Sequence, residues 1–590
     1  MLRGISNRVR RWLFGRDLAV WYSPQYRLPL SGVEARTGFD ARRADHAIWF
    51  LLERRVIGRR NLRTPRRAGY GELSRVHTAE LLDSLGQAET LGHIWNVDPS
   101  DVPVEELMTS VRLACGATID AARELLRPGP RRVGLRALNL LGGFHHARPG
   151  VAGGFCPVND IAVAIAAVRA DGFTGRVLVL DLDAHPPDGT AECLAGDPAH
   201  WIGSISGSDW GPLPPSVDET VLPERTGDEG YLRALDALLS RMPPGDLAFV
   251  LAGGDVLAGD PIGLLGLTEA GCRERDLRVS DALFRVPSVW LPSGGYTGNA
   301  WRVLAGTGLS LGIRSRVPIP LDYDPLVARF SSIARSLAPA ELGPGPDQID
   351  LDDVARDLGL SSAGRHLFLG FYTGEGLEHA LSRYGILGEL ARLGYGPFRA
   401  EVHPEGVGES ARLLDAPSGE PLIELVAEKR VVSGSAMLYV HWLALRHPRA
   451  RFSDDRPRLP GQDVPGLGLA RELQELLARM AVRLGLEGLA FRPSAYHLAY
   501  GGRELLRFVD PARQGRFEAL VRDLEAVPLL AATRGLAEGR VTMNGAPYAW
   551  ETEEMVRFLK PREEDRTAIE AEKARVKFQL NGAQRPDSPG

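Results

Sequence analysis

The sequence predicts an α/β protein whose first and larger part is a mostly parallel β-sheet flanked by helices. Short apolar runs at residues 177–183, 247–252 and 286–291 are typical of strands that are buried on both faces. Helical patterns, such as those at residues 45–56 and 161–169, alternate with these runs. Regular alternation of this kind favours one parallel sheet covered by helices. Ligand-binding residues are expected at the carboxyl ends of its strands.

The length of the chain, 590 residues, indicates more than one domain. We expect a first domain over residues 17–316 and a linker region over 317–365, because Gly and Pro residues are dense in 337–347. A second, smaller α/β domain is expected over residues 366–560, and a charged, partly disordered tail over 561–590. The elements expected in the second domain are helices at 376–393 and 468–484 and strands at 422–432 and 436–445, and residues 494–497 and 506–510 continue the α/β order.

Composition and charge exclude several classes of protein. The chain is 44% hydrophobic and 25% charged, as in ordinary globular proteins, and its formal net charge of -5 gives no electrostatic case for a nucleic-acid partner. Its four cysteines are widely spaced and indicate neither a disulfide framework nor a thiolate zinc site, so we expect a cytoplasmic protein. No apolar run approaches the roughly 18–20 residues of a membrane span.

The first 16 residues are rich in arginine and contain Trp12, Leu13 and Phe14. They lack the apolar core and the cleavage site of a secretory signal. A helix on a membrane surface is one interpretation of this segment. A solvated extension is the interpretation that we favour.

Three polar side chains alternate at the end of the strand predicted at 177–183. Asp181, Asp183 and His185 fall at every second position, so an extended backbone projects them to one side. Two carboxylates and an imidazole in a crevice cost free energy unless they are paired, and a divalent metal ion is their natural partner. The sequence therefore favours a metal-dependent enzyme.

Four further segments carry groups suited to the same chemistry. A pair of glycines precedes the adjacent histidines His145 and His146 and lets the backbone approach closely. The other three segments are a glycine-rich loop before a helix and the ends of two apolar strands. They present Gly154, Phe155, Asp255 and Tyr296.

These segments, in this order, resemble the histone deacetylase superfamily, which also contains acetylpolyamine amidohydrolases and acetoin-utilisation proteins. The runs Asp-Leu-Asp-Ala-His at 181–185 and Leu-Ala-Gly-Gly-Asp at 251–255 are most similar to its class IV-like bacterial branch. The resemblance covers roughly the first half of the chain. It implies the arginase/deacetylase fold and zinc-dependent hydrolysis of N-acyl amides to a free amine and a carboxylate.

The resemblance also implies a role for each matched residue. Asp183, His185 and Asp255 match the zinc ligands, which leave one position open for water and substrate. His146 matches the general base and His145 its partner imidazole. The other matches are the carboxylates that hold the imidazoles, Asp181 and Asp188, the hydroxyl that donates to the oxyanion, Tyr296, and the substrate contacts, Phe155 as a tunnel wall and the Gly154 carbonyl as acceptor of the amide N–H.

Two departures from the family pattern are visible. Pro186-Pro187 stands where relatives usually carry His-Gly or Gln-Gly, and the missing N–H groups predict a different path to Asp188. Ser293 interrupts the glycines before Tyr296, which predicts altered loop flexibility without loss of the hydroxyl.

The resemblance leaves the substrate open. An acylated lysine in a protein, an acetylpolyamine and a small acylated amine all fit, and the segment 93–103 with Asp98 and Asp101 is a candidate rim of the site. As in relatives, Asp181 and the backbone near Ser204 are expected to hold a structural monovalent cation such as K+.

A ureohydrolase of the arginase kind is the main alternative enzyme, because it shares this fold and uses an Asp-Ala-His motif with two manganese ions. The run Asp183-Ala184-His185 fits that motif superficially. A second metal ion would need further carboxylates beside His185 and near Asp255, and the sequence supplies none there.

The second domain faintly resembles the N-acetyltransferase-like (GNAT) fold. A glycine-containing turn at 466–470 is similar to the turn whose N–H groups hold the pyrophosphate of acyl-CoA, although its spacing differs by one residue and it has no basic side chain. We favour a non-catalytic module that binds a substrate or partner. The alternative is an active acyltransferase whose candidate acid or base residues are Tyr496, His497 and Glu551.

Overall fold

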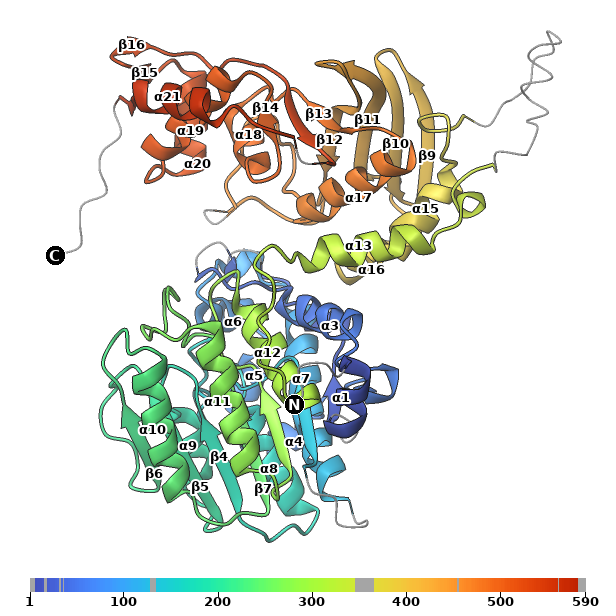
Figure 1. Cartoon of the computed structure of the whole chain (residues 1–590). Helices are drawn as coiled ribbons and strands as arrows, with labels where there is room; N and C mark the ends of the chain where they lie inside the picture. Colours follow the sequence, from blue (N-terminus) through green and yellow to red (C-terminus); the bar gives the residue numbers. More distant parts are fainter. Residues whose placement is uncertain are drawn as a thin grey trace. The chain divides into compact units, whose positions relative to one another are not determined.

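The computed structural model describes residues 6–14, 18–30, 33–34, 37–127, 134–344, 366–453, 456–560 and 562–581. The chain forms two compact units, Met1–Pro325 and Leu326–Gly590 (Figure 1). The predicted linker region contains a helix, α13 (Pro325–Ser336), and its residues 345–365 lie outside the described part.

The first unit is built on one sheet of parallel strands. The strands are β1 (Leu18–Trp21), β2 (Leu62–Arg63), β3 (Arg136–Asn139), β4 (Val177–Asp181), β5 (His200–Ser206), β6 (Val217–Val221), β7 (Leu247–Leu251) and β8 (Ser288–Leu291). Their order in the sheet is β2-β1-β3-β8-β7-β4-β5-β6. Every pairing is parallel, which confirms the predicted fold class and agrees with the arginase/deacetylase fold.

Helices cover this sheet (Figure 1). They are α1 (Asn7–Phe14), α3 (Arg43–Glu53), α4 (Tyr70–Leu73), α5 (Ala79–Ser84), α6 (Ala88–Trp95), α7 (Val104–Leu126), α8 (Asp160–Ala170), α9 (Asp188–Leu194), α10 (Asp228–Arg241), α11 (Glu269–Ala282) and α12 (Ala300–Ile313), with short 3-10 helices η1 (Pro24–Tyr26), η2 (Arg59–Asn61) and η3 (Pro99–Asp101). The long α7 packs against β1, β3 and β8, and α10 packs against β5 and β6.

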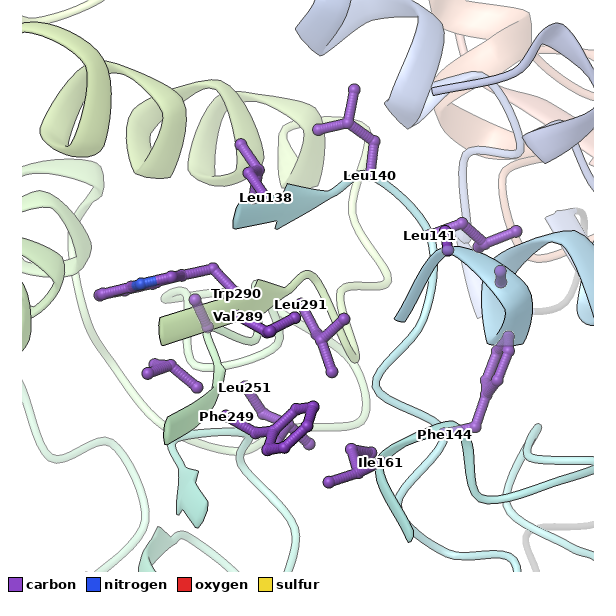
Figure 2. Close-up of a cluster of buried hydrophobic side chains, with 14 of the residues drawn as sticks. Leu138, Leu140, Leu141, Phe144, Ile161, Phe249, Leu251, Val289, Trp290 and Leu291 are labelled. Atoms are coloured by element: carbon purple, nitrogen blue, oxygen red, sulfur yellow. The ribbon is translucent and has the colours of Figure 1, made fainter. Parts of the chain in front are cut away.

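Large apolar side chains fill the space between the strands and helices at the centre of the first unit. Figure 2 shows side chains of β3, β7 and β8 together with Ile161 of α8 and Phe144. These residues are almost completely buried, and each such side chain contributes about 2 kcal/mol through burial. Phe144 immediately precedes His145 and His146, so the core anchors the loop that carries the two histidines.

The strand predicted at 177–183 ends earlier than expected. β4 stops at Asp181, and the residues after it follow an irregular path. Asp183 and His185 therefore lie in the loop beyond the strand. Of the three polar residues, only Asp181 lies on the extended backbone that the prediction assumed.

The expectation of a solvated extension at the N-terminus is wrong for the described residues. Residues 7–14 form helix α1, which packs against α12.

The second unit contains a mixed sheet in the order β14-β17-β13-β12-β11-β10-β9 and a small sheet in the order β16-β15-β18. The strands are β9 (Phe398–Glu405), β10 (Gly408–Asp415), β11 (Pro421–Val432), β12 (Ser435–Leu445), β13 (Gly488–Phe491), β14 (Arg507–Phe508), β15 (Val541–Met543), β16 (Ala546–Pro547), β17 (Met555–Phe558) and β18 (Phe578–Leu580). The helices after α13 are η4 (Pro339–Glu341), α15 (Gly374–Arg383), α16 (Ile386–Arg392), α17 (Ala470–Arg483), α18 (Tyr496–Gly502), α19 (Pro511–Asp523), α20 (Leu529–Ala537) and α21 (Arg566–Arg575).

In the large sheet, β12 pairs parallel with β13 across α17, and the other pairings are antiparallel. The second α/β region is thus confirmed, whereas its assignment to the GNAT fold stays a prediction. The helix predicted at 376–393 is wrong in one respect. Gly385 adopts φ 87°, a conformation that a continuing helix cannot use, and it separates α15 from α16.

Candidate metal centre and active site

Two carboxylates and an imidazole converge where β4 and β7 end side by side in the sheet. Asp183 and His185 follow β4, and Asp255 follows β7. The Nδ1 atom of His185 lies 3.1 Å from Oδ1 of Asp183 and 3.1 Å from Oδ2 of Asp255. All three side chains are buried. The structure thus brings together the three residues that the sequence predicts as metal ligands.

This group fits a divalent cation. One ligand atom from each of the three residues lies within 4.8 Å of the others. Burial and the charge of Asp183 raise the pKa of Asp255, because two buried carboxylates this close together repel each other unless a positive group lies between them. Zinc binds carboxylate oxygens and imidazole nitrogens, and catalytic zinc sites typically have three protein ligands and one open position. Within the described part of the chain, this is the group of three His, Cys, Asp or Glu side chains that converges in this way.

The two histidines each bind a different carboxylate through Nδ1. His145 Nδ1 lies 2.8 Å from Asp181 Oδ2, and His146 Nδ1 lies 2.7 Å from Asp188 Oδ1. Because a carboxylate accepts, each Nδ1 carries the proton, and Nε2 of His146 is left as the basic nitrogen.

Opposite charge states are expected for the two rings. Burial lowers the pKa of His145, but the charges of Asp181 and Asp183 outweigh it and raise this pKa to about 9. Burial and the neighbouring charge of His145 lower the pKa of His146 to about 4, against the opposing effect of Asp188. At neutral pH, His145 is a cation and His146 is a neutral base.

Pro186-Pro187 does not prevent the contact between Asp188 and His146. Pro187 caps α9, which begins at Asp188, and a proline is tolerated there because the first N–H groups of a helix have no partner within the helix. The second oxygen of Asp188 accepts a hydrogen bond of 3.0 Å from Arg148 Nη2. Burial opposes the charge of Asp188, but His146 and Arg148 outweigh it and lower the pKa to about 2.

The loop after β8 brings Tyr296 to the metal ligands. Gly294 N donates to Asp183 Oδ2 at 2.7 Å, and a Cβ on Gly294 would meet the Asp255 carboxylate at 2.4 Å. Ser293 Oγ donates to the Gly143 carbonyl at 3.0 Å, so the serine that departs from the family pattern ties this loop to the histidine loop. Burial and the nearby carboxylates raise the pKa of Tyr296, which keeps its phenol protonated as a donor.

One cavity of about 40 Å³ is lined by His145, His146, Asp183, His185 and Tyr296. The Phe155 ring lies 5.6 Å from the Tyr296 ring across it. Gly154 is required by close approach, because a Cβ there would meet His146 Cδ2 at 2.6 Å and its φ is 56°. The Gly154 carbonyl accepts a hydrogen bond of 3.2 Å from the Cys156 thiol, whose pKa burial raises, and keeps its second lone pair.

A buried arginine holds the two metal-ligand loops together from behind. Arg275 of α11 is fully buried and donates to the Gly253 carbonyl at 2.8 Å and to the Leu182 carbonyl at 3.4 Å. Its charge is balanced by Asp276 at 2.9 Å. The backbone beside Asp183 and Asp255 is thereby fixed by one guanidinium.

Sequence reasoning missed several residues of this site. Arg43 donates to the Ser293 carbonyl at 2.6 Å, and Arg148 binds Asp188. Trp210 stacks on His146 with 4.9 Å between ring centroids and lies 5.6 Å from His185. A lone tryptophan in the Gly/Pro-rich segment 207–216 was a usable signal for Trp210, whereas nothing in the sequence around Arg43 indicates its role.

We predict that Trp210→Ala raises KM by up to about tenfold and changes kcat little. The exposed ring covers one face of His146, and an aromatic contact of this kind is worth about 1 kcal/mol. Steady-state kinetics with an acetyl-lysine peptide measures the effect. Phe284→Ala, which removes an exposed ring from the turn after α11, is the matched control. A loss confined to kcat would contradict a role in substrate binding.

Comparison with known proteins places this site in a family. The model of the histone deacetylase domain matches residues 38–307. The chain is 30% identical to histone deacetylase 2 of Arabidopsis thaliana over 308 residues, which are 49% of this chain and 77% of the relative. It is 31% identical to an uncharacterized protein of Picosynechococcus over 295 residues, 48% of this chain and 92% of the relative. The chain belongs to the histone deacetylase family.

One more relative and one solved structure are similar to this chain over part of its length. A probable deacetylase of Archaeoglobus fulgidus is 30% identical over 226 residues, 36% of this chain and 61% of the relative. The crystal structure of a histone deacetylase homolog from Aquifex aeolicus has a TM-score of 0.43 at 23% identity and covers 52% of this chain and 87% of its own.

Membership in the histone deacetylase family makes the first unit a hydrolase that acts on acetylated substrates. All ten site residues predicted from the sequence fall within the matched range 38–307. The second unit lies beyond that range. No helix of the described residues has the length and apolar character needed to cross a membrane.

The acid and base candidates of the second unit have structural contacts. Tyr496 packs against the rings of Tyr500, Phe517 and Trp550, and burial raises its pKa. Glu551 pairs with Arg516 at 2.9 Å. His497 is buried, and burial lowers its pKa.

Proposed function

We propose that the first unit is a zinc-dependent deacylase that hydrolyses an N-acyl amide of lysine or a related amine to the free amine and a carboxylate. The observation that carries this proposal is the convergence of Asp183, His185 and Asp255 beside a cavity that a neutral imidazole and a protonated phenol line.

The residues of the cavity divide the chemistry between them. Asp183, His185 and Asp255 would hold a Zn2+ ion, which would supply Lewis-acid polarisation of the amide carbonyl and of the attacking water. Neutral His146 takes the proton of that water at Nε2 and returns it to the leaving amine. The hydroxyl of Tyr296 donates a hydrogen bond to the carbonyl oxygen, which becomes negative as the carbonyl is attacked.

Other groups orient the substrate and the base. Asp188 fixes the ring of His146 by a hydrogen bond. The cationic His145, which is hydrogen-bonded to Asp181, lowers the pKa of His146 and so keeps it neutral. Phe155 forms one wall for the aliphatic chain, and the free lone pair of the Gly154 carbonyl accepts the amide N–H.

A direct test combines metal analysis with a substrate panel. Purified protein should hold one zinc per chain and cleave acetylated or longer-acylated lysine peptides, acetylpolyamines, or both. A hydroxamate should inhibit far more strongly than the matching carboxamide, because the hydroxamate group can chelate the metal ion and accept the hydrogen bond of Tyr296 at the same time. Two manganese ions per chain, or equal inhibition by both compounds, would overturn the proposal.

We predict that Tyr296→Phe lowers kcat by about a hundredfold and changes KM little, because the lost hydroxyl acts on charge that develops in the transition state. Kinetics with an acetyl-lysine peptide measures it. Tyr323→Phe, which removes a phenol outside the cavity, is the matched control. Near-normal kcat in Tyr296→Phe would exclude the assigned role.

The pH profile gives a further prediction. A base acts only when unprotonated, and burial with the charge of His145 lowers the pKa of His146 from 6.5 to about 4. kcat/KM should therefore persist as the pH falls through 6.5 and be lost only near pH 4. Asp188 raises this pKa, so Asp188→Asn should shift the acid limb to still lower pH. An unshifted limb in the variant would argue against His146 as the titrating group.

Two further assignments rest on separate observations. Ser204 of β5 pairs with Asp181 of β4, and its buried hydroxyl has no hydrogen-bond partner among the described residues, so a monovalent cation such as K+ fits beside it. The test is to measure Tm in a buffer that contains K+ and in one that contains a bulky organic cation instead. A higher Tm in K+ would support this site.

For the second unit we infer a non-catalytic binding module, because Tyr496 and Glu551 are engaged in packing and ion pairing. Isothermal titration with acetyl-CoA separates the two interpretations: binding heat at millimolar ligand would favour the acyltransferase instead.

A further inference from the structure

Helix α1 presents its apolar side chains to solvent. Val9, Trp12 and Leu13 are 46%, 61% and 48% exposed. Their spacing of three and four residues places them on one face of the helix. A helix at a protein surface normally turns such a face toward the core. In α1 the arrangement is reversed.

Hydrogen bonds from the other face explain the reversal. Asn7 Nδ2 donates to the Arg54 carbonyl at 3.1 Å, and Arg11 Nη1 donates to the Ile57 carbonyl at 3.0 Å. At the end of the helix, Arg136 donates to the Phe14 carbonyl. Polar groups thus attach α1 to the segment after α3, and the helix cannot roll to bury Trp12 without breaking these bonds.

The segment that α1 contacts is strongly basic. Between residues 53 and 61 the sequence has four arginines and a single acid, Glu53. Arg54, Arg55, Arg59 and Arg60 are all exposed. The segment on which α1 is anchored therefore carries a cluster of exposed positive charge.

We propose that α1 and residues 54–60 form a docking surface for an anionic lipid bilayer. Tryptophan and leucine insert at the boundary between headgroups and acyl chains, and arginines bind anionic headgroups. Neither signal holds a protein on a membrane alone, whereas the combination of an apolar anchor and a basic cluster does. A bilayer also matches a patch of three apolar side chains better than a protein partner, whose interface needs a far larger apolar centre.

Vesicle sedimentation with the full chain tests this proposal. The protein should bind phosphatidylcholine vesicles that contain about 30% phosphatidylglycerol at least tenfold more tightly than pure phosphatidylcholine, and high salt should weaken the binding. The double variant Trp12→Ser, Leu13→Ser should lose about tenfold of this affinity, and so should Arg59→Gln, Arg60→Gln. Deacylase activity on a small soluble substrate should stay unchanged in both.

Leu321→Ser with Val317→Ser is the matched control, because these apolar side chains of the same unit are 93% and 65% exposed. It should bind vesicles as the unmodified chain does. Equal binding to neutral vesicles, or an equal loss in the control, would overturn the proposal. A change of molar mass in light scattering on Trp12→Ser, Leu13→Ser, without loss of vesicle binding, would show instead that the face joins two copies of the chain.

Discussion

Replacing His146 by alanine should lower kcat by about a thousandfold, because His146 is the neutral base that lines the cavity beside the metal ligands. The cationic His145 cannot substitute, since its pKa is raised to about 9 by Asp181 and Asp183 and its ring holds its proton at neutral pH. The metal content should not change, because His146 is not among the three converging ligands. Single-turnover kinetics with an acetyl-lysine peptide, together with zinc analysis, measures both.

A matched control for His146→Ala is His403→Ala, which removes an exposed imidazole from β9 of the second unit. It should retain normal kcat. The free energy of unfolding of both variants should be compared by urea titration, since His146 is packed against Gly154 and Trp210. If His146→Ala kept more than about a tenth of the normal kcat, the proton would have to be carried by another group.

The chemistry of the site could be predicted because its residues follow strand ends. Asp183 and His185 are separated from Asp255 by about 70 residues in sequence, yet the parallel sheet makes β4 and β7 neighbours and brings their loops together. The residue types and the side of the sheet were therefore predictable from local pattern and the topology of a parallel sheet.

What the sequence could not show depends on contacts through space. The charge states of His145 and His146 are opposite although the residues are adjacent, because one faces two carboxylates and the other faces that cation. Arg275, 20 residues beyond Asp255, fixes both metal-ligand loops, and no local motif marks it. The direction of α1 is a further case, since its amphipathic pattern alone predicts burial of the face that is exposed.

Two predicted element boundaries were wrong, each for a local reason. Apolar periodicity continues across residues 376–393, but the backbone of Gly385 leaves the helical region and divides the helix. At 177–183 the apolar run extends to Leu182, while β4 ends at Asp181, because the chain then turns toward Asp255: Ala184 N donates to Asp255 Oδ1 at 3.1 Å.

Asp183→Asn should abolish detectable deacylation by removing the metal. Asp183 contributes charge to the ligand group, and its second oxygen accepts from Gly294 N in the tyrosine loop. Loss of a residue that only hydrogen-bonds a metal ligand typically lowers metal affinity by about 10- to 100-fold, and the loss of Asp183 itself should lower the affinity for zinc by more than this. Competition with a chromogenic chelator measures this affinity, and the increase of Tm on zinc addition should disappear with it. Asp246→Asn, at the end of β7 that is far from Asp255, is the control and should keep the normal zinc affinity and the increase of Tm. Zinc retained at normal affinity in Asp183→Asn would mean that the metal is held elsewhere, and the deacylase mechanism would lose its foundation.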